Sequence, residues 1–272
     1  MAAKKRIVVT GSRGVFGRHL IAALGDAYDV VATTRDTLDL HDVEAVARAA
    51  RGAFAVACTA GPFQQLDRGI VRAVVNEGAH WLDIADDERW FFDLLDDYAL
   101  DALARERRVV VMPGLSTLPA ISCALVRRVV GDRQSCLSVT ITLYIGADNA
   151  KGAAAIASGA ALHAPDRELL RRELGIDAEV RTRFEVPGGR IAMHALRVLP
   201  LRIRVRLAKA IARLAPRFGS SGGYVQVNDT RIAIHQNAAV LPLVYALEQL
   251  KGRSGCLSPT VLNPEELLQF VT

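Results

Sequence analysis

The sequence predicts an α/β protein, with a doubly wound parallel sheet followed by a second, smaller α+β domain. Three observations support this fold class. Apolar strand patterns alternate with amphipathic helices through the first half of the chain. The first of these strands, residues 6–10, runs directly into a glycine-punctuated turn and then a helix. After about Tyr144 the alternation stops, and a stretch rich in Ala and Gly is followed by shorter strand patterns.

The alternating part of the chain is rich in Val, Ile and Ala. Its strand patterns are continuously apolar, which is typical of a parallel sheet covered on both faces. We expect strands at residues 6–10, 29–34, 53–59, 80–85, 109–113 and 137–145. Between them we expect helices at 16–24, 43–50, 66–77, 88–107 and 118–130, several of which end beside a glycine. The first domain is expected over 1–120, with 238–272 packing back onto it.

The second domain is expected over residues 121–237, where it would hold the substrate and the contact of a homodimer. Its predicted helices are 166–174 and 201–214, its predicted strands are 178–185, 190–197, 224–227 and 230–235, and a last helix is expected at 240–250. The helix 201–214 places Arg202 and Arg206 opposite Ile203 and Leu207. Either this basic face is exposed to solvent while the apolar side of the helix covers the sheet, or the basic face contacts a membrane surface. Both interpretations stay open.

The composition excludes several classes of protein. Apolar residues make up 51% of the chain and the net charge is +5, but no apolar run reaches the roughly 20 residues of a membrane span. No signal-peptide pattern precedes the first strand, so we expect a cytoplasmic protein without stable membrane insertion. Aromatic residues are few and not interleaved with basic ones, which argues against nucleic acid as a partner. The cysteines lack metal-ligand spacing, and we expect no metal site.

A glycine-punctuated loop follows the first strand. It consists of Gly11, Ser12, Arg13, Gly14, Val15, Phe16 and Gly17. Gly11 permits a tight turn, Gly14 lets the backbone approach a pyrophosphate, and Gly17 lets the helix pack closely. The helix N-terminus offers free N–H groups to the phosphates. Because a strand precedes the loop and a helix follows it, this pattern favours a dinucleotide site over a structural turn.

The end of the second strand indicates which dinucleotide is preferred. NAD sites usually place a carboxylate there, to accept from the ribose 2′-hydroxyl. Here Thr33, Thr34 and Arg35 stand at that position, and Arg35 suits a 2′-phosphate. Arg13 adds a second positive charge, so the pattern favours NADP. The alternative is that Arg35 is solvated and that Asp36 serves NAD.

Two further loops are expected at the same edge of the sheet. Asp39 and Leu40 lie where related folds pack against the adenine, although the neighbouring Asp42 fits equally well as a plain helix N-cap. The third strand ends in small residues that leave room for the nicotinamide ribose. These are Thr59, Ala60, Gly61 and Pro62. Ligands of open α/β sheets bind beyond the carboxyl ends of the strands, where all of these loops would meet.

Taken together, the motifs at residues 11–17, 60–63, 80–86 and 113–120 resemble the saccharopine dehydrogenase-like family. The resemblance covers residues 5–150, weakens afterwards and returns near 255–258. It implies a Rossmann domain and a second domain on a mixed sheet that supplies the substrate face and often the dimer contact. It also implies a nicotinamide cofactor, usually NADP, and hydride transfer to or from C=N, C=C or C=O. The second domain looks shorter than in full-length members.

Hydride transfer takes most of its chemistry from the cofactor, while the protein positions the substrate and handles a proton. The chain has no Tyr-x-x-x-Lys pair of the short-chain dehydrogenase type. We expect Asp83 and Asp86 at or just past a strand end, facing the crevice as acid or base. Tyr144 is a third catalytic candidate, at the entrance to the second domain. For Asp86, capping of the next helix is the alternative.

Three residues are candidates for binding the substrate. Ser116 and Thr117 are expected to begin a helix after Pro113 and Gly114, where they would bind a substrate carboxylate or simply cap the helix. Lys151 lies in a Gly- and Ala-rich loop and is either an anion anchor or a surface lysine.

The sequence thus predicts an NADP-dependent oxidoreductase acting on a C=N, C=C or C=O bond of a small organic substrate. Two alternatives stay open. One is a catalytically silent NADP-binding sensor or scaffold, and the other is an enoyl reductase at the membrane surface.

Overall fold

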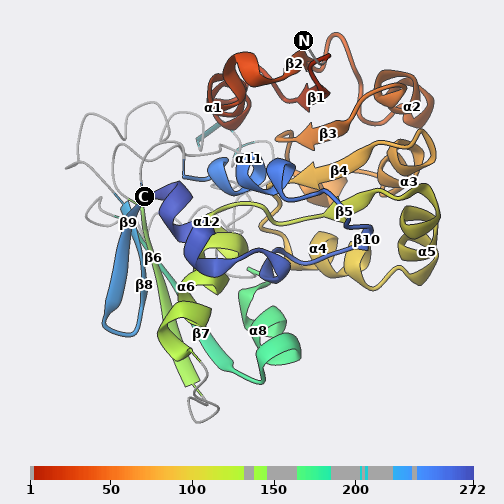
Figure 1. Cartoon of the computed structure of the whole chain (residues 1–272). Helices are drawn as coiled ribbons and strands as arrows, with labels where there is room; N and C mark the ends of the chain where they lie inside the picture. Colours follow the sequence, from red (N-terminus) through yellow and green to blue (C-terminus); the bar gives the residue numbers. More distant parts are fainter. Residues whose placement is uncertain are drawn as a thin grey trace.

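Two sheets lie apart in the computed structural model, with helices packed around and between them (Figure 1). The structure describes residues 3–131, 138–145, 164–184, 223–234 and 238–272, together with Ile203, Arg206 and Leu207. The larger sheet is parallel and covered by helices on both faces, and the smaller sheet is mixed. The predicted fold class is therefore confirmed.

The larger sheet has six parallel strands in the order β10-β5-β4-β3-β1-β2. β2 and β3 flank β1 on opposite sides, so the direction of winding reverses at β1. Ligands of such sheets bind beyond the carboxyl ends of the strands at this reversal. The strands are β1 Arg6–Thr10, β2 Asp29–Ala32, β3 Ala55–Cys58, β4 His80–Asp83, β5 Val110–Met112 and β10 Gly255–Cys256.

The helices of this domain are α1 Val15–Leu24, α2 Val43–Ala50, α3 Gly69–Asn76, α4 Glu88–Leu95 and α5 Tyr98–Arg107. Residues 88–107 form two helices, so the prediction of one long helix is wrong. The carboxylate of Asp97 accepts a hydrogen bond from the backbone N–H of Leu100 at 2.9 Å. This N-cap stabilises a new helix start directly after the end of α4.

The segment after β5 also departs from the prediction. Residues Thr117–Ile121 form a π-type turn, and the regular helix α6 spans Ser122–Val130. Pro119 is the reason, because steric repulsion drives the residue before a proline into an extended conformation. Leu118 accordingly has φ −116° and ψ 126°. The predicted helix over 118–130 is therefore wrong in its first turn.

The smaller sheet has the strand order β7-β6-β8-β9. Its strands are β6 Ser138–Ile145, β7 Asp177–Phe184, β8 Gly223–Val227 and β9 Thr230–Ile234. The predicted helix 166–174 is present as α8, Asp166–Leu174, which packs on β7, while α6 packs on β8. Alternate residues such as Val139, Ile141 and Val225 are buried in this domain.

Part of the predicted second domain falls outside the described residues, including the strand 190–197 and most of the helix 201–214. Three residues of that helix are described, Ile203, Arg206 and Leu207. Ile203 and Leu207 are 46% and 41% exposed, so in this structure they do not form the covered apolar side that one interpretation requires. No helix in the part of the chain that the structure describes is long and apolar enough to cross a membrane.

The C-terminal segment returns to the first domain. Its elements are α11 Leu241–Glu248, β10, a short 3-10 turn at Pro259–Val261 and α12 Pro264–Val271. β10 adds a parallel strand beside β5, α11 packs against α1, and α12 packs against α6 (Figure 1). The segment therefore connects the parallel sheet with the helix that supports the second sheet.

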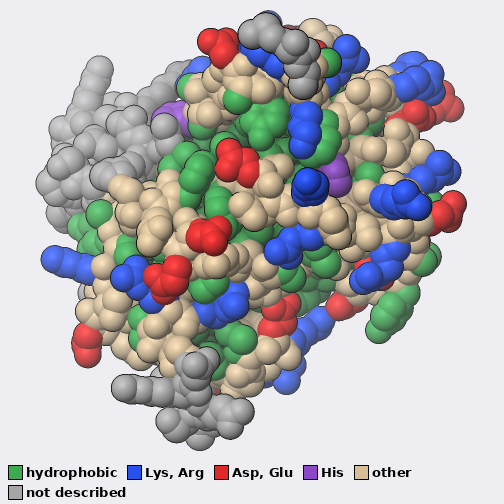
Figure 2. Space-filling model, in the orientation of Figure 1, with side chains coloured by type: hydrophobic (Ala, Val, Ile, Leu, Met, Phe, Trp, Pro, Cys, Tyr) green, Lys and Arg blue, Asp and Glu red, His purple; other side chains and the backbone are tan. Residues whose placement is uncertain are grey.

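Acidic and basic side chains are interspersed over the face of the molecule in Figure 2. Many of the basic side chains lie in ion pairs, such as Arg51 with Glu77 and Arg105 with Asp101. On this face, basic side chains therefore alternate with acidic ones.

His80 begins β4 and is 8% exposed. Its Nδ1 atom accepts a hydrogen bond from the backbone N–H of Val110 at 2.8 Å, which links β4 to β5. Burial, together with the charge of Lys5, lowers the pKa of His80 to about 4. The neutral imidazole is therefore the form that the folded protein stabilises.

We predict that acidification destabilises the protein through His80. Between pH 6.5 and 4 the unfolded chain binds a proton at this residue and the folded chain does not, so up to about 3 kcal/mol is lost. His80→Asn keeps an acceptor for Val110 and removes the titration. Urea unfolding at pH 7 and pH 4.5 should show a smaller loss of stability in His80→Asn than in the native protein, and an equal loss would contradict this assignment.

Candidate functional site

The glycine loop closes over the carboxyl end of β1. Gly11 has a φ of +71°, and its carbonyl accepts from the N–H of Gly14 at 2.8 Å. A Cβ atom on Gly17 would lie 2.2 Å from the Gly11 carbonyl oxygen, so only glycine lets α1 approach this closely. Gly14 is the N-cap of α1 and offers no side chain to its first turn. The first N–H groups of α1, from Val15 and Phe16 onward, therefore remain available to an anion.

Arg13 connects the glycine loop to the loop after β2. Its guanidinium lies 2.8 Å from the carboxylate of Asp36, and both side chains are about three-quarters exposed, at 76% and 75%. Arg35 is exposed beside this pair. The structure thus brings both predicted 2′-phosphate residues, Arg13 and Arg35, to one corner of the sheet. Asp36, the residue of the NAD alternative, is engaged with Arg13.

The two threonines at the end of β2 have structural partners. Thr33 is buried, and its hydroxyl donates to the carbonyl of Val9 at 3.2 Å. The backbone N–H of Thr34 donates to the hydroxyl of Thr37 at 2.9 Å and forms the turn that follows. Both threonines therefore stabilise the backbone at the end of β2, whereas the exposed side chains of Arg13 and Arg35 supply the positive charge there.

The next loop places Asp39 and Leu40 before α2. Asp39 accepts from the N–H of His41 at 3.0 Å, which makes a local turn. Asp42 accepts from the N–H of Ala45 at 2.9 Å and is the N-cap of α2, which is the structural role anticipated as one alternative. Leu40 is half-buried and packs against the core.

The loop after β3 lies directly against the glycine loop. The hydroxyl of Thr59 donates to the carbonyl of Thr10 at 2.7 Å. A Cβ atom on Gly11 would lie 3.0 Å from the Cα of Ala60, so these two loops touch backbone to backbone. Gly61 is exposed and Pro62 half-buried, and neither fills the space above the strand ends with a large side chain.

Asp83 does not face the crevice, and the prediction that it does is wrong. The side chain is fully buried at the end of β4. Its carboxylate accepts four N–H groups, from the Trp81 and Trp90 indoles at 2.8 and 2.9 Å and from the Ala85 and Gly114 backbones at 3.0 and 3.1 Å. Burial raises the pKa of Asp83, but every partner is a donor, so the site fits the ionised form.

The two acids that follow have separate roles. Asp87 is the N-cap of α4, accepting from the N–H of Trp90 at 2.8 Å, and also accepts from the side chain of Gln64 at 2.8 Å. Asp86 is half-buried at the carboxyl edge of the sheet, and burial raises its pKa to about 6. Asp86 is therefore not the cap, and it is the carboxyl group of this loop suited to exchange a proton near neutral pH.

The other predicted site residues are dispersed. Ser116 directly precedes the π-type turn and Thr117 is its first residue, whereas the regular helix α6 begins only at Ser122, so the expectation that these residues begin a regular helix is wrong. Tyr144 lies on β6 with its ring stacked on Tyr224, at a centroid distance of 4.8 Å. Lys151 lies outside the described residues.

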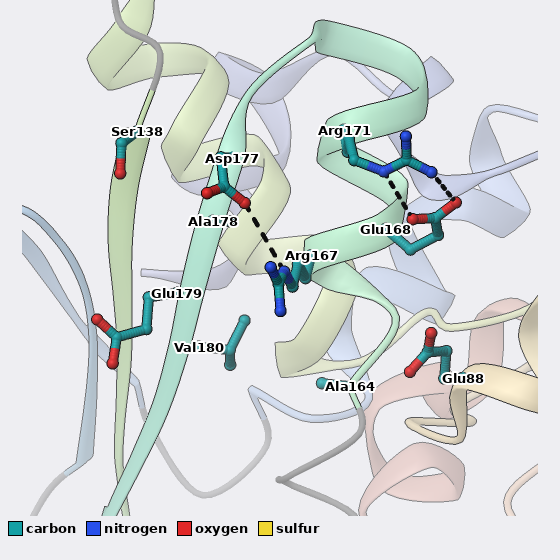
Figure 3. A pocket seen from close by; sticks show the side chains of 10 residues that line it. All are labelled: Glu88, Ser138, Ala164, Arg167, Glu168, Arg171, Asp177, Ala178, Glu179 and Val180. Carbon is teal, nitrogen blue, oxygen red and sulfur yellow. Dashed lines mark hydrogen bonds and ion pairs between the residues drawn. The ribbon is translucent and has the colours of Figure 1, made fainter.

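A cavity of about 700 Å³ opens between β6, β7, α8 and the start of α4 (Figure 3). The Arg171 guanidinium is held by Glu168 through two hydrogen bonds of 2.9 and 2.7 Å. The Arg167 guanidinium lies 3.7 Å from Asp177 and makes a looser pair. The cavity thus presents a cation whose hydrogen-bond donors are largely available, in a size range typical of small-molecule sites. It is lined by Glu88, Ser138, Ala164, Arg167, Glu168, Arg171, Asp177, Ala178, Glu179 and Val180.

Sequence reasoning did not single out Arg167, which lines this cavity, or the buried residues Asp166 and Ser122, whose side chains contact each other. Asp166 and Arg167 open the predicted helix 166–174, where an acid followed by a base looks like ordinary capping and surface charge. Ser122 lies inside a stretch predicted as a continuous helix. Among the residues that the structure describes, no three His, Cys, Asp or Glu side chains gather as a metal site would require.

Comparison with solved structures shows that this two-domain fold is shared along nearly the whole chain. Saccharopine dehydrogenase (L-Glu forming) from Saccharomyces cerevisiae has a TM-score of 0.57 at 9% identity, over 97% of this chain and 96% of that chain. DAP dehydrogenase from C. glutamicum, in complex with DAP, has a TM-score of 0.51 at 14% identity, over 98% and 96%. An engineered D-amino acid dehydrogenase bound to NADP+ has a TM-score of 0.50 at 14% identity, over 98% and 96%.

At such identities the likeness shows the fold. A scan against protein-family models found no match, and neither did a search of curated proteins. The presence of a saccharopine dehydrogenase among the similar structures agrees with the resemblance found in the sequence motifs.

We predict that Asp83→Asn lowers the free energy of unfolding by about 3 kcal/mol, because an amide would set an N–H group against buried N–H donors. Asp87→Asn is the matched control. Asparagine caps a helix about as well as aspartate, so this variant should lose less than about 1 kcal/mol. Equilibrium unfolding in urea measures both changes, and similar stabilities for the two variants would contradict the central role of Asp83.

Proposed function

We propose that this protein is an NADP-dependent oxidoreductase that transfers a hydride between the cofactor and a carbon–nitrogen bond of a small, amino-acid-like substrate. The observation that carries the proposal is the glycine loop at the winding reversal of the sheet, with an uncapped helix N-terminus behind it. C=N is favoured over C=C and C=O because the three similar structures are dehydrogenases of saccharopine, DAP and D-amino acids. We also propose that the protein is a homodimer and that it is located in the cytoplasm.

The residues present fit the cofactor. A Cβ atom on Gly11 or Gly17 would meet backbone atoms, so the loop stays free of side chains where a pyrophosphate would approach. Arg13 and Arg35 would hold the 2′-phosphate, and Asp39 and Leu40 would border the adenine. The small loop at 59–62 would leave room for the nicotinamide ribose. The bound cofactor supplies the group that accepts or donates the hydride.

The chain's own contribution is to orient the substrate and to handle its proton. Asp86 lies at the carboxyl edge of β4 with a pKa of about 6, so it is largely ionised at neutral pH and able to accept a proton. Arg167 projects into the cavity, where it would bind a substrate carboxylate (Figure 3). Glu88 lies two residues after Asp86 and lines the same cavity, so the cavity borders the segment that follows Asp86.

We predict that the cofactor preference resides in Arg13 and Arg35. In the double variant Arg13→Gln, Arg35→Gln the dissociation constant for NADPH should rise at least about tenfold while that for NADH stays unchanged, since only NADPH carries the 2′-phosphate. Titration calorimetry measures both constants.

Gly14→Leu is the companion variant, because a side chain at the pyrophosphate should abolish the binding of both cofactors while circular dichroism shows an intact fold. If the native protein binds no NADPH, the proposed function fails.

We predict that Arg167→Gln raises the KM for an amino-acid substrate at least about tenfold with little change in kcat, because it removes ground-state binding of the carboxylate. Arg171→Gln is the matched control. Its guanidinium is already held by Glu168, so its KM should stay near that of the native enzyme. Steady-state NADPH formation measures both, and equal effects of the two variants would argue against a substrate role for Arg167.

A further inference from the structure

Arg18 lies in the first turn of α1, directly after the glycine loop, and its side chain is exposed. The partial positive charge of a helix N-terminus repels a cation, so the charge of Arg18 does not stabilise α1. The first turn of α1 contains no acidic residue, and no side chain caps it. The helix itself therefore supplies nothing that neutralises this positive charge, which suits an anionic ligand at the loop.

The side chain of Arg18 turns back onto the glycine loop. Its Nη1 atom donates to the carbonyl of Arg13 at 2.6 Å, and its backbone N–H donates to the carbonyl of Gly14 at 3.1 Å. The N–H of Gly14 donates to the carbonyl of Gly11 at 2.8 Å. Both polar groups of the peptide between Arg13 and Gly14 are therefore held, the carbonyl by Arg18 and the N–H by the loop itself.

This contact changes what the loop offers to an anion. The carbonyl of Arg13 carries a partial negative charge and belongs to the same turn that would meet a pyrophosphate. A guanidinium that is bonded to this carbonyl offsets the negative charge through a charge-assisted hydrogen bond. Without Arg18 the carbonyl would lose this partner and would be free to turn toward the phosphates, which it would repel.

We propose that Arg18 is the positioning residue of the pyrophosphate subsite and acts through the carbonyl of Arg13. The inference rests on the proposed function. Arg18 keeps the peptide between Arg13 and Gly14 in the conformation that leaves the N-terminus of α1 open to the phosphates. The pyrophosphate is common to NADPH and NADH, whereas the side chains of Arg13 and Arg35 would meet the 2′-phosphate that only NADPH carries. The two roles are therefore separable by experiment.

Titration calorimetry with both cofactors tests the role of Arg18 without any turnover. In Arg18→Met the dissociation constants for NADPH and NADH should each rise about tenfold and their ratio should stay native, because the lost hydrogen bond serves the shared pyrophosphate. Arg48→Met is the matched control. It removes the same charge from an exposed arginine of α2 that lies 3.9 Å from Asp42, and it should keep both native constants. Native constants in Arg18→Met overturn the proposal, and so does a loss confined to NADPH.

Cofactor fragments locate the effect within the site. ADP carries the diphosphate and 2′-AMP carries the 2′-phosphate, so Arg18→Met should weaken the binding of ADP about tenfold and leave that of 2′-AMP unchanged. Arg18→Lys keeps a donor and a positive charge, should recover part of the affinity for ADP, and serves if Arg18→Met fails to fold.

A merely structural role makes a different prediction. It would lower the melting temperature of Arg18→Met and weaken the binding of ADP and 2′-AMP alike, and that result overturns the proposal. If the native protein binds neither NADPH nor NADH, the proposed function fails instead. Native binding of NADPH together with unchanged ADP binding in Arg18→Met overturns this inference alone.

Discussion

The structure depends above all on the buried carboxylate of Asp83. A charge removed from water needs several strong hydrogen bonds, and Asp83 receives four N–H groups. The donors come from Trp81 on β4, from Ala85 just after it, from Trp90 on α4 and from Gly114 after β5. A Cβ atom on Gly114 would lie 2.6 Å from the ring of Phe91, so these elements meet with no spare space. This contact fixes the loops that follow β4 and β5 at the carboxyl edge of the sheet.

The loop after β4 shows how environment separates acids that are close in sequence. Asp83 is enclosed by donors, Asp87 caps α4, and Asp86 has neither function. Because the first two acids fix the backbone on either side, Asp86 is held half-buried just after β4, and it is neither the cap of α4 nor a member of the Asp83 network. A carboxyl group with a raised pKa in such a position is what proton transfer near neutral pH requires. The neighbouring acids thus leave Asp86 as the acid of this loop that we propose to exchange a proton.

The second domain contributes through α8, which is tied to the first domain at several points. Arg172 pairs with Asp96 at 2.9 Å and lies over the ring of Phe92, and Glu173 accepts from Ser258 at 2.6 Å. Asp166 meets Ser122 at the other end of the helix. These contacts hold the cavity wall against the Rossmann domain, so the distance between the proposed substrate site and the strand ends is set by packed elements on both sides.

The sequence by itself determined the parallel sheet and the glycine loop, because apolar periodicity and backbone conformation are encoded over a few neighbouring residues, and it offered the Asp42 cap as one of two alternatives. It placed Arg13 and Arg35 at the same corner, since the carboxyl ends of adjacent parallel strands meet. Tertiary structure alone decided that Asp83 is buried and that Asp86 is not a cap. It also brought Asp166 to Ser122. The physical reason is that the pKa and role of a carboxyl group depend on donors and charges distant in the chain, which no local pattern records.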